Sequence, residues 1–267
     1  MAPVPVAVES DLKLPAKVDV VVIGGGIIGA ATTYFLAERG VSVALVEKQH
    51  VACEQSSRNW GWCRQMGRDP REMPLIVKSL ELWRGLNERL GAETGFRQRG
   101  IFYLATSDKE LARHESWLAH ARPHGVDSRL IGTEEVAALL PGAARAFAGA
   151  LHTPSDGRAE PTLAAPALAR AARAKGAILL QPCAARGLER QGGRVAAVVT
   201  ERGTIRCATA VLAGGAWSRL FCGNLGLELP QLKVVNSVLR TGPLDAGFDC
   251  AASGAGFAFR KRLDGGF

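Results

Sequence analysis

Three glycines and one glutamate near the N-terminus have the types and spacing of a nucleotide-binding turn. Gly24, Gly26 and Gly29 follow a short apolar run, and Glu47 lies 18 residues beyond Gly29. Gly24 permits a tight turn, Gly26 lets the backbone approach a pyrophosphate without an intervening Cβ, and Gly29 allows a helix and a strand to pack closely. A carboxylate at position 47 can accept hydrogen bonds from ribose hydroxyls. This spacing therefore predicts dinucleotide binding.

A strand, a helix and a second strand must position these residues. The apolar residues 18–23 predict the first strand, the stretch after Gly29 predicts a helix that ends at Gly40, and residues 41–46 predict the second strand. The unpaired N–H groups and the positive dipole end of such a helix bind an anion without a basic side chain. Residues 20–37 are uncharged and almost long enough to cross a membrane. Three consecutive glycines near the start of that stretch favour a turn instead, so we expect no membrane span.

Composition and charge argue against other classes of protein. The chain has 267 residues, of which 47% are hydrophobic and 22% charged, enough for one large or two modest domains. The net charge of +8 comes mostly from arginines spread along the chain, with no basic block typical of nucleic-acid binding. The six cysteines form no CxxC pair, which predicts buried thiols and no metal site. Residues 1–15 lack the apolar core of a secretory signal, so we expect a cytoplasmic location.

The rest of the chain predicts further helices and strands. Helices are predicted at 74–90, 108–121 with Asp108 as N-cap, 133–140 with Thr133 as N-cap, and 161–175. Strands are predicted at 100–105, 177–181, 184–189, 194–201, 205–207, 210–213, 232–240 and 256–262. Residues 49–73 are irregular and rich in Arg, Ser, Trp and Gly. The histidines fall on or near predicted loops and helix ends, and we expect them to be solvated: His50, His114, His120, His124 and His152.

The order of these pieces resembles the amine-oxidising flavoprotein superfamily, which includes D-amino-acid oxidases and dehydrogenases, glycine oxidase and sarcosine oxidase. The similarity covers essentially the whole chain and is strongest at residues 20–29 (VVVIGGGIIG), 56–59 (SSRN) and 211–218 (VLAGGAWS). It implies an α+β fold, with an α/β FAD-binding Rossmann-like domain and a sheet-containing substrate domain. Residues 1–70 and 150–220 are then expected to form the FAD-binding domain, and residues 71–149 and 221–267 the substrate domain.

The resemblance implies FAD as the cofactor. The residues that it implies in cofactor binding are Gly24, Gly26, Gly29, Glu47, Ser56, Ser57, Arg58, Asn59, Ala185, Ala213 and Gly214. The loop from Ser56 to Arg64 is expected to lie by the flavin ring, where N–H and guanidinium donors stabilise the negative charge that develops on reduction. Cys63 in this loop has no neighbour that suggests a nucleophile, and we expect it to be a packing residue.

The resemblance also implies a reaction. The substrate of this family is an amine with a neighbouring carboxylate; its Cα–H leaves as a hydride to flavin N5, and the resulting imine hydrolyses. The protein must orient the substrate and hold its carboxylate, ideally with a bidentate arginine, for which Arg64, Arg240 and Arg260 are candidates. A D-amino acid or a glycine-like substrate is slightly favoured over a sarcosine-like one. Oxygen or another electron acceptor completes the cycle, and the sequence leaves the oligomeric state open.

Two alternatives remain open from the sequence. The first strand–helix–strand unit alone does not separate FAD from NAD, so an NAD-dependent dehydrogenase is one of them. The other is an inactive or partly folded remnant, because residues 260–266 predict a strand and a hairpin turn without a return strand. We accordingly expect a truncated member of the superfamily with an incomplete substrate domain. Exposure of Phe257 and Phe259 and weak FAD binding would follow.

Overall fold

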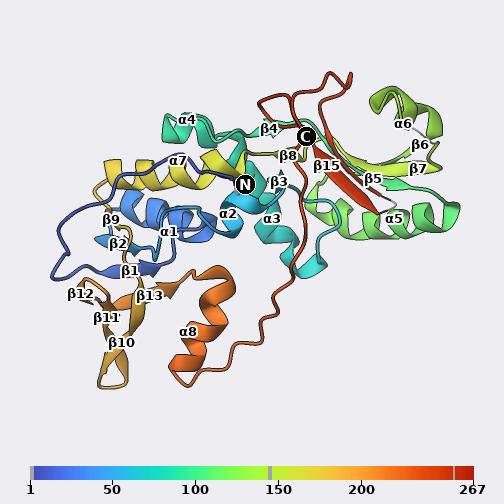
Figure 1. Ribbon diagram of the computed structural model, residues 1–267. Coiled ribbons are helices and arrows are strands. Elements are labelled where there is room, and N and C mark those ends of the chain that lie inside the picture. The colour runs from blue at the N-terminus through green and yellow to red at the C-terminus, as the bar shows by residue number, and fades with distance from the viewer. Residues whose placement is uncertain (1–2, 144–145, 255) are drawn as a thin grey trace. The chain divides into compact units, whose positions relative to one another are not determined.

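The chain divides into two compact units in a computed structural model, which describes residues 3–143, 146–254 and 256–267. Unit 1 comprises the residues up to Asn59, Leu90–Glu93 and Pro161–Val238, and unit 2 comprises Trp60–Arg89, Thr94–Glu160 and Leu239–Phe267. Unit 1 thus ends earlier than residue 70 in its first segment and reaches beyond residue 220 in its last. Both units mix helices and sheets, which confirms the predicted α+β class (Figure 1).

Unit 1 contains a four-stranded parallel sheet and a three-stranded antiparallel sheet. Its elements are β1 (Val20–Ile23), α1 (Ile27–Glu38), β2 (Val43–Val46), α2 (Gln55–Arg58), α7 (Pro161–Ala174), β9 (Ile178–Leu180), β10 (Ala185–Gln191), β11 (Arg194–Thr200), β12 (Gly203–Arg206), β13 (Thr209–Leu212), the 3₁₀ helix η3 (Gly215–Trp217) and α8 (Ser218–Asn224). The strand orders are β13-β1-β2-β9 and β10-β11-β12.

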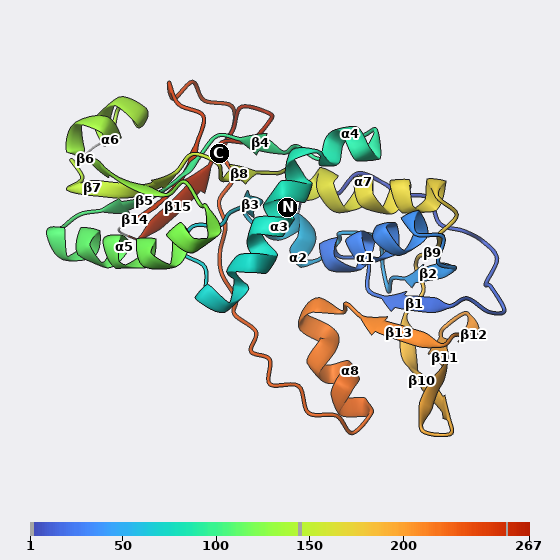
Figure 2. The same cartoon turned by 180° about the vertical axis from the view of Figure 1, so that it is seen from behind.

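The first strand of the predicted nucleotide unit lies in the middle of the parallel sheet. Val22 of β1 pairs with Leu45 of β2 on one side and with Val211 of β13 on the other. Helices α1 and α7 pack against each other beside this sheet, as both views show (Figures 1 and 2). Every residue of β2 is buried, as expected of a parallel strand covered on both faces.

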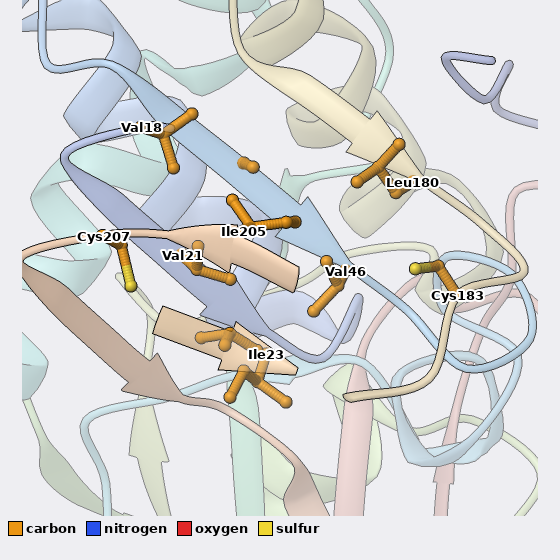
Figure 3. Packing of buried hydrophobic residues seen from close by; sticks show 10 residues of the cluster. Val18, Val21, Ile23, Val46, Leu180, Cys183, Ile205 and Cys207 are labelled. Atoms are coloured by element: carbon orange, nitrogen blue, oxygen red, sulfur yellow. The ribbon is translucent and has the colours of Figure 1, made fainter. Parts of the chain in front are cut away.

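A hydrophobic core joins the parallel sheet to the antiparallel sheet. Val21, Ile23 and Val46 of the parallel sheet lie in the same cluster as Ile205 of β12 and Cys207, which follows it (Figure 3). Burying an aliphatic side chain of this size stabilises the fold by about 1.5–3 kcal/mol. This core fixes the sheet whose strand ends carry the candidate site.

The uncharged stretch 20–37 folds as β1, a glycine turn and most of α1. In the part of the chain that the structure describes, no helix has both the length and the apolar character needed to cross a bilayer.

Unit 2 is built on a five-stranded mixed sheet and a small three-stranded sheet. Its elements are β3 (Trp62–Cys63), η1 (Pro70–Glu72), α3 (Met73–Arg84), α4 (Leu86–Leu90, the last residue of which belongs to unit 1), β4 (Arg97–Gln98), β5 (Ile101–Ala105), α5 (Asp108–Ala121), η2 (Arg122–His124), β6 (Arg129–Gly132), α6 (Thr133–Leu139), β7 (Gly149–Thr153), β8 (Gly157–Arg158), β14 (Ala251–Gly254) and β15 (Phe257–Arg260). The strand orders are β15-β14-β5-β7-β6 and β3-β8-β4.

The larger sheet of unit 2 is antiparallel except where β14 runs parallel to β5. Helix α5 packs on β5, β6 and β7, and α6 packs on β6 and β7. Phe259 packs against the core that contains Phe102 and Cys250, so the expectation that it is exposed was wrong. Phe257 is 40% exposed, in line with the expectation.

Several element boundaries differ from the predictions. The helix predicted at 74–90 is interrupted at Gly85, between α3 and α4. The N-cap of α5 is Ser107, whose hydroxyl accepts a hydrogen bond from the Glu110 N–H at 3.3 Å, rather than Asp108. Thr133 is the first residue of α6, and Gly132 occupies the cap position. Residues 232–240 form no strand, because none of the described residues pairs with them.

Candidate cofactor site

The turn between β1 and α1 accepts only glycine at two positions. Gly24 has a φ of +112°, and a Cβ there would lie 2.4 Å from the Ala213 carbonyl oxygen. A Cβ on Gly29 would lie 1.9 Å from the Gly24 carbonyl oxygen. Real Cβ atoms do not approach oxygen so closely, so both side chains must be absent for β1, α1 and the end of β13 to meet.

Hydrogen bonds fix the turn, and among the described residues the Gly26 N–H has no partner. The Gly25 N–H donates to Glu47 Oε2 at 2.6 Å, and the Gly25 carbonyl accepts from the Ala52 N–H at 2.9 Å. The Ile27 N–H donates to Ser56 Oγ at 2.8 Å. The Gly26 N–H donates to none of the described residues. It therefore remains as a donor for a ligand at the N-terminus of α1, where the helix dipole favours an anion.

Glu47 is held in place at the end of β2. Its side chain is buried; Oε2 accepts the Gly25 N–H, and Oε1 accepts the Gln49 N–H at 2.9 Å. Its backbone N–H donates to the Leu180 carbonyl at 3.0 Å, and its carbonyl accepts from the Cys183 N–H at 2.6 Å. A carboxylate oxygen accepts more than one hydrogen bond, so both oxygens keep capacity for ligand hydroxyls.

A cavity of about 380 Å³ opens over this turn, entirely within unit 1. It is lined by Ile23, Gly24, Gly26, Val46, Glu47, Lys48, Ala52, Cys53, Glu54, Gln55, Ser56, Arg58, Ala184, Ala185, Arg186, Leu212, Ala213, Gly214, Gly215, Ala216, Trp217, Leu220, Phe221, Asn224 and Lys233. The structure thus brings together eight of the eleven predicted cofactor residues: Gly24, Gly26, Glu47, Ser56, Arg58, Ala185, Ala213 and Gly214.

The other three predicted residues do not line the cavity. Gly29 packs against the turn, as described above. Ser57 is buried and donates through Oγ to the Glu54 carbonyl at 3.2 Å. Asn59 is exposed and donates through Nδ2 to the Gln55 carbonyl at 2.9 Å. Direct cofactor contacts from these three residues stay predictions.

Lys48 and Trp217 form part of the cavity wall, although neither was among the predicted cofactor residues. Lys48 Nζ lies 3.6 Å from the centroid of the Trp217 ring and 2.9 Å from Glu54 Oε1. A cation over an aromatic face is stabilising, and more so where water is partly excluded. Two sequence signals were available: Lys48 directly follows Glu47, and Trp217 lies in the 211–218 motif.

The residues of this cavity fit a dinucleotide. Two glycines remove the side chains that would fill the turn, the Gly26 N–H lacks a protein partner within the described ranges, and a fixed carboxylate lies beside them. Pyrophosphate needs N–H donors and close backbone approach, while ribose hydroxyls need an acceptor such as Glu47. The described residues contain no group of three or more His, Cys, Asp or Glu side chains that could hold a metal ion.

The three arginines predicted to hold a carboxylate all belong to unit 2 and differ in their partners. Arg260 is buried and paired with Glu160 through Nη1–Oε1 at 2.8 Å and Nη2–Oε2 at 3.0 Å, which weighs against a role in substrate binding. Arg240 is exposed and pairs with Asp264 at 2.6 Å. Arg64 donates to the Met66 carbonyl, and within the described ranges it has no carboxylate at ion-pair distance.

Arg64 lies in a partly enclosed environment. Burial is the main effect that lowers the pKa of its guanidinium, which nevertheless stays charged near neutrality. The guanidinium lies 5.8 Å from the centroid of the Tyr103 ring. Burial raises the pKa of the Cys63 thiol next to it, which agrees with packing rather than nucleophilic chemistry.

Two further groups in unit 2 have strongly shifted pKa values. Asp156 is fully buried; burial raises its pKa to about 6, although its carboxylate accepts hydrogen bonds from the Gln65 and Met66 N–H groups at 2.7 and 3.2 Å. His152 lies in β7, stacked on Phe102 with ring centroids 4.2 Å apart, and burial lowers its pKa to about 4. The expectation that His152 is solvated was therefore wrong.

Comparison with known proteins identifies the family. Residues 19–267 match the family described as DAO, FAD dependent oxidoreductase, and the chain belongs to this family. The resemblance stated from the sequence is confirmed, and so is FAD as the cofactor of the family, in preference to NAD.

Similar proteins include two that are named for sarcosine and one that is named for L-amino acids. Mouse (Mus musculus) mitochondrial sarcosine dehydrogenase is 30% identical over 85% of this chain, and the sarcosine oxidase subunit beta of Rhizobium meliloti (strain 1021) is 33% identical over 79%. The solved structure of L-amino acid deaminase from Proteus myxofaciens superimposes with a TM-score of 0.92 at 37% identity over 98% of this chain. The matches cover 26%, 53% and 60% of these three proteins respectively.

Proposed function

We propose that this chain binds FAD in the unit 1 cavity and oxidises the C–N bond of a small amino acid or N-alkyl amino acid. The observation that carries the proposal is the turn at Gly24–Gly26, where close backbone packing leaves the Gly26 N–H without a partner in the described part of the chain. Membership of an FAD-dependent family supports the choice of cofactor.

Each part of the cavity has a proposed role toward FAD. The Gly26 N–H and the N-terminus of α1 bind the pyrophosphate, and Glu47 accepts hydrogen bonds from ribose hydroxyls. The main chain near Ala185, Ala213 and Gly214, which lines the same cavity, offers further contacts. The internal packing of Gly24 and Gly29 sets the shape of the turn, and the two N–H groups that bind Glu47 hold its carboxylate beside that turn.

The chemistry divides between cofactor and protein. When bound, FAD supplies a hydride acceptor at flavin N5 for the Cα–H of the substrate. The side chains of this chain have to hold the substrate carboxylate and keep water from the reacting carbon. No proton-transfer group is assigned to this step, because hydride loss from a neutral amine requires none.

We propose Arg64 as the residue that holds the substrate carboxylate. Glu160 already occupies both outer nitrogens of Arg260, and Asp264 pairs with Arg240. Partial burial of Arg64 strengthens a charge-assisted hydrogen bond relative to one in water.

The relatives guide the choice of substrate class. Two of them are named for sarcosine and one for L-amino acids. These compounds share an amine and a carboxylate on one carbon, so the pair of groups, rather than a particular side chain, defines the proposed class. The preference for a D-amino acid or glycine over sarcosine stays a prediction, as do the electron acceptor and the cytoplasmic location.

A substrate panel with flavin reduction as the readout tests the proposal. The purified chain is reconstituted with FAD, and glycine, sarcosine, proline and D- and L-amino acids are added without oxygen. We expect loss of the oxidised flavin absorption band with at least one of these compounds. Reduction only by amines that lack a carboxylate would contradict the proposed substrate class, and failure to bind FAD would contradict the proposed cofactor role.

Paired arginine variants test the carboxylate ligand. Arg64→Met should lower the second-order rate of flavin reduction by about 10- to 100-fold, because a charged hydrogen bond is lost, and FAD content should stay unchanged. Arg240→Met removes a comparable side chain from an exposed ion pair and serves as the control. Equal rates of flavin reduction in Arg64→Met and Arg240→Met would show that Arg64 does not hold the substrate carboxylate.

A further inference from the structure

The loop of residues 48–54, which forms one wall of the cavity, contains a strained residue. Ala52 has a φ of +64° and is the one non-glycine residue with left-handed backbone among those that the structure describes. L-residues other than glycine avoid this conformation because of their Cβ, so surrounding contacts must hold it. Ala52 is buried and lines the cavity.

Ala52 sets the direction of the Gly26 N–H through a hydrogen bond to the preceding residue, Gly25. Its N–H donates to the Gly25 carbonyl at 2.9 Å. Within a trans peptide unit the carbonyl of one residue and the N–H of the next point in opposite directions. The bond from Ala52 therefore orients the peptide between Gly25 and Gly26 and turns the Gly26 N–H away from the loop.

The side chain of Gln181 holds the residue just before Ala52. Gln181 Oε1 accepts the Val51 N–H at 2.7 Å, and Gln181 Nε2 donates to the Val8 carbonyl at 2.5 Å. The Gln181 backbone N–H donates to Ser10 Oγ at 3.0 Å. The two ends of one amide thus join the 48–54 loop to the N-terminal arm, residues 6–12.

The N-terminal arm is itself fixed to β9, the edge strand of the parallel sheet. The Asp11 N–H donates to the Leu179 carbonyl at 2.7 Å, and Asp11 Oδ2 accepts the Leu179 N–H at 2.8 Å. Arg173 pairs with Asp11 at 3.1 Å and with Glu9 at 2.6 Å. Gln181 therefore braces the loop against a fixed part of unit 1.

We infer that Gln181 is a positioning residue for FAD: through Val51 it keeps Ala52 in its left-handed conformation and so orients the Gly26 N–H toward the pyrophosphate. This inference rests on the proposed function of the cavity. Gln181 is not among the residues that line the cavity, so it acts through the loop rather than by contact with the cofactor.

Variants at positions 181 and 52 test the inference. Gln181→Met keeps the approximate side-chain length and removes both hydrogen bonds, and Ala52→Gly removes the cost of the left-handed conformation. Gln191→Met, at the exposed end of β10, is the matched control. The dissociation constant of FAD and the hydrogen exchange of residues 48–54 without FAD are measured for each variant, for Gln181→Met/Ala52→Gly and for the wild type.

We expect Gln181→Met to weaken FAD binding by about 10-fold and to speed exchange of the Ala52 amide. In the double variant, Ala52→Gly should restore most of the FAD affinity and most of the slow amide exchange at residue 52. A glycine adopts the left-handed conformation without the hydrogen bond from Val51 to Gln181. A general loss of packing would not be repaired by a second substitution that removes a methyl group. Wild-type affinity and exchange in Gln181→Met, or additive losses in the double variant, would overturn the inference.

The two measurements separate this inference from the proposed function. A wild-type chain that binds no FAD would contradict the proposed function and, with it, the assignment of Gln181 to FAD binding. Bound FAD with unchanged affinity in Gln181→Met would contradict the role of Gln181 alone. Faster exchange of the Ala52 amide in Gln181→Met, reversed by Ala52→Gly, supports the brace on the loop whether or not FAD is present.

Discussion

Glu160 and Arg260 form a two-point ion pair inside unit 2, with Nη1–Oε1 at 2.8 Å and Nη2–Oε2 at 3.0 Å, and both side chains are less than a tenth exposed. Glu160 Oε1 also accepts the Leu263 N–H at 2.9 Å. Burial alone would raise the pKa of Glu160, but the hydrogen bonds and charge of Arg260 lower it overall. The pair therefore joins β15 and the residues after it to the segment that follows β8.

Breaking this pair should destabilise the chain strongly. Glu160→Ala leaves the Arg260 charge buried without a partner, and the free energy of unfolding should fall by about 3–5 kcal/mol. Denaturant titration measures the change. Glu135→Gln, in the exposed pair with Arg129, is the control and should leave the unfolding midpoint unchanged. A similar midpoint for Glu160→Ala and the wild type would show that the buried pair is not needed.

The glycine turn should be intolerant of a single methyl group. Gly29→Ala places its Cβ against the Gly24 carbonyl, which should force α1 away from β1, abolish FAD retention and lower the free energy of unfolding by about 1–3 kcal/mol. Gly187→Ala in β10 is the control, because a Cβ there meets no heavy atom within 4 Å. Flavin content per chain after gel filtration checks the prediction, and full flavin in Gly29→Ala would refute the close packing of the turn.

Asp156 should make the chain more stable in mild acid than near neutral pH. Its pKa is raised to about 6 from an ordinary 3.8, chiefly by burial. The folded chain then binds the proton more tightly than the unfolded chain, so this contribution is complete below about pH 4 and is lost as the pH rises through 6. Relative to Asp156→Asn, wild-type stability should fall by up to roughly 3 kcal/mol between pH 4 and 7. Parallel pH profiles for the two proteins would contradict the shift.

His152 should have the opposite effect on the pH dependence of stability, over nearly the same pH range. Burial lowers the pKa of His152 to about 4 from an ordinary 6.5. Between these two pH values the unfolded chain binds a proton at His152 and the folded chain does not. Stability is therefore lost as the pH falls from 6.5 to 4. His152→Gln should lose less stability than the wild type between pH 7 and 4.5, as thermal unfolding at both values will measure. His120→Gln, on the exposed side of α5, is the control and should keep the wild-type pH dependence.

The local sequence pattern was sufficient to predict the strand–helix–strand unit formed by β1, α1 and β2. The apolar strand, the glycines and the spacing to Glu47 all lie within 30 residues, and their geometry follows from backbone sterics alone. The extent of β1, α1 and β2 followed from the same pattern within a few residues.

Features that depend on distant partners were missed. His152 is buried because Phe102 stacks on it, and Glu160 is paired across 100 residues of sequence with Arg260. The predicted strand 232–240 has the right composition, but a strand also needs a neighbour with free hydrogen-bonding groups, which composition does not reveal. The left-handed conformation of Ala52 could not be predicted from the sequence, because alanine rarely adopts it.

The packing of Gly24 against Ala213 also determines when the cavity can form during synthesis of the chain. The turn and β1 are synthesised early, whereas β13, which completes the sheet beside them, comes nearly 190 residues later in the chain. At about 5–20 residues per second the ribosome needs roughly 10–40 s to supply it. During that interval one edge of β1 is open and the cavity has no second wall. The nascent chain must therefore wait for β13, the last strand of the parallel sheet to be synthesised, before FAD can bind the folded form.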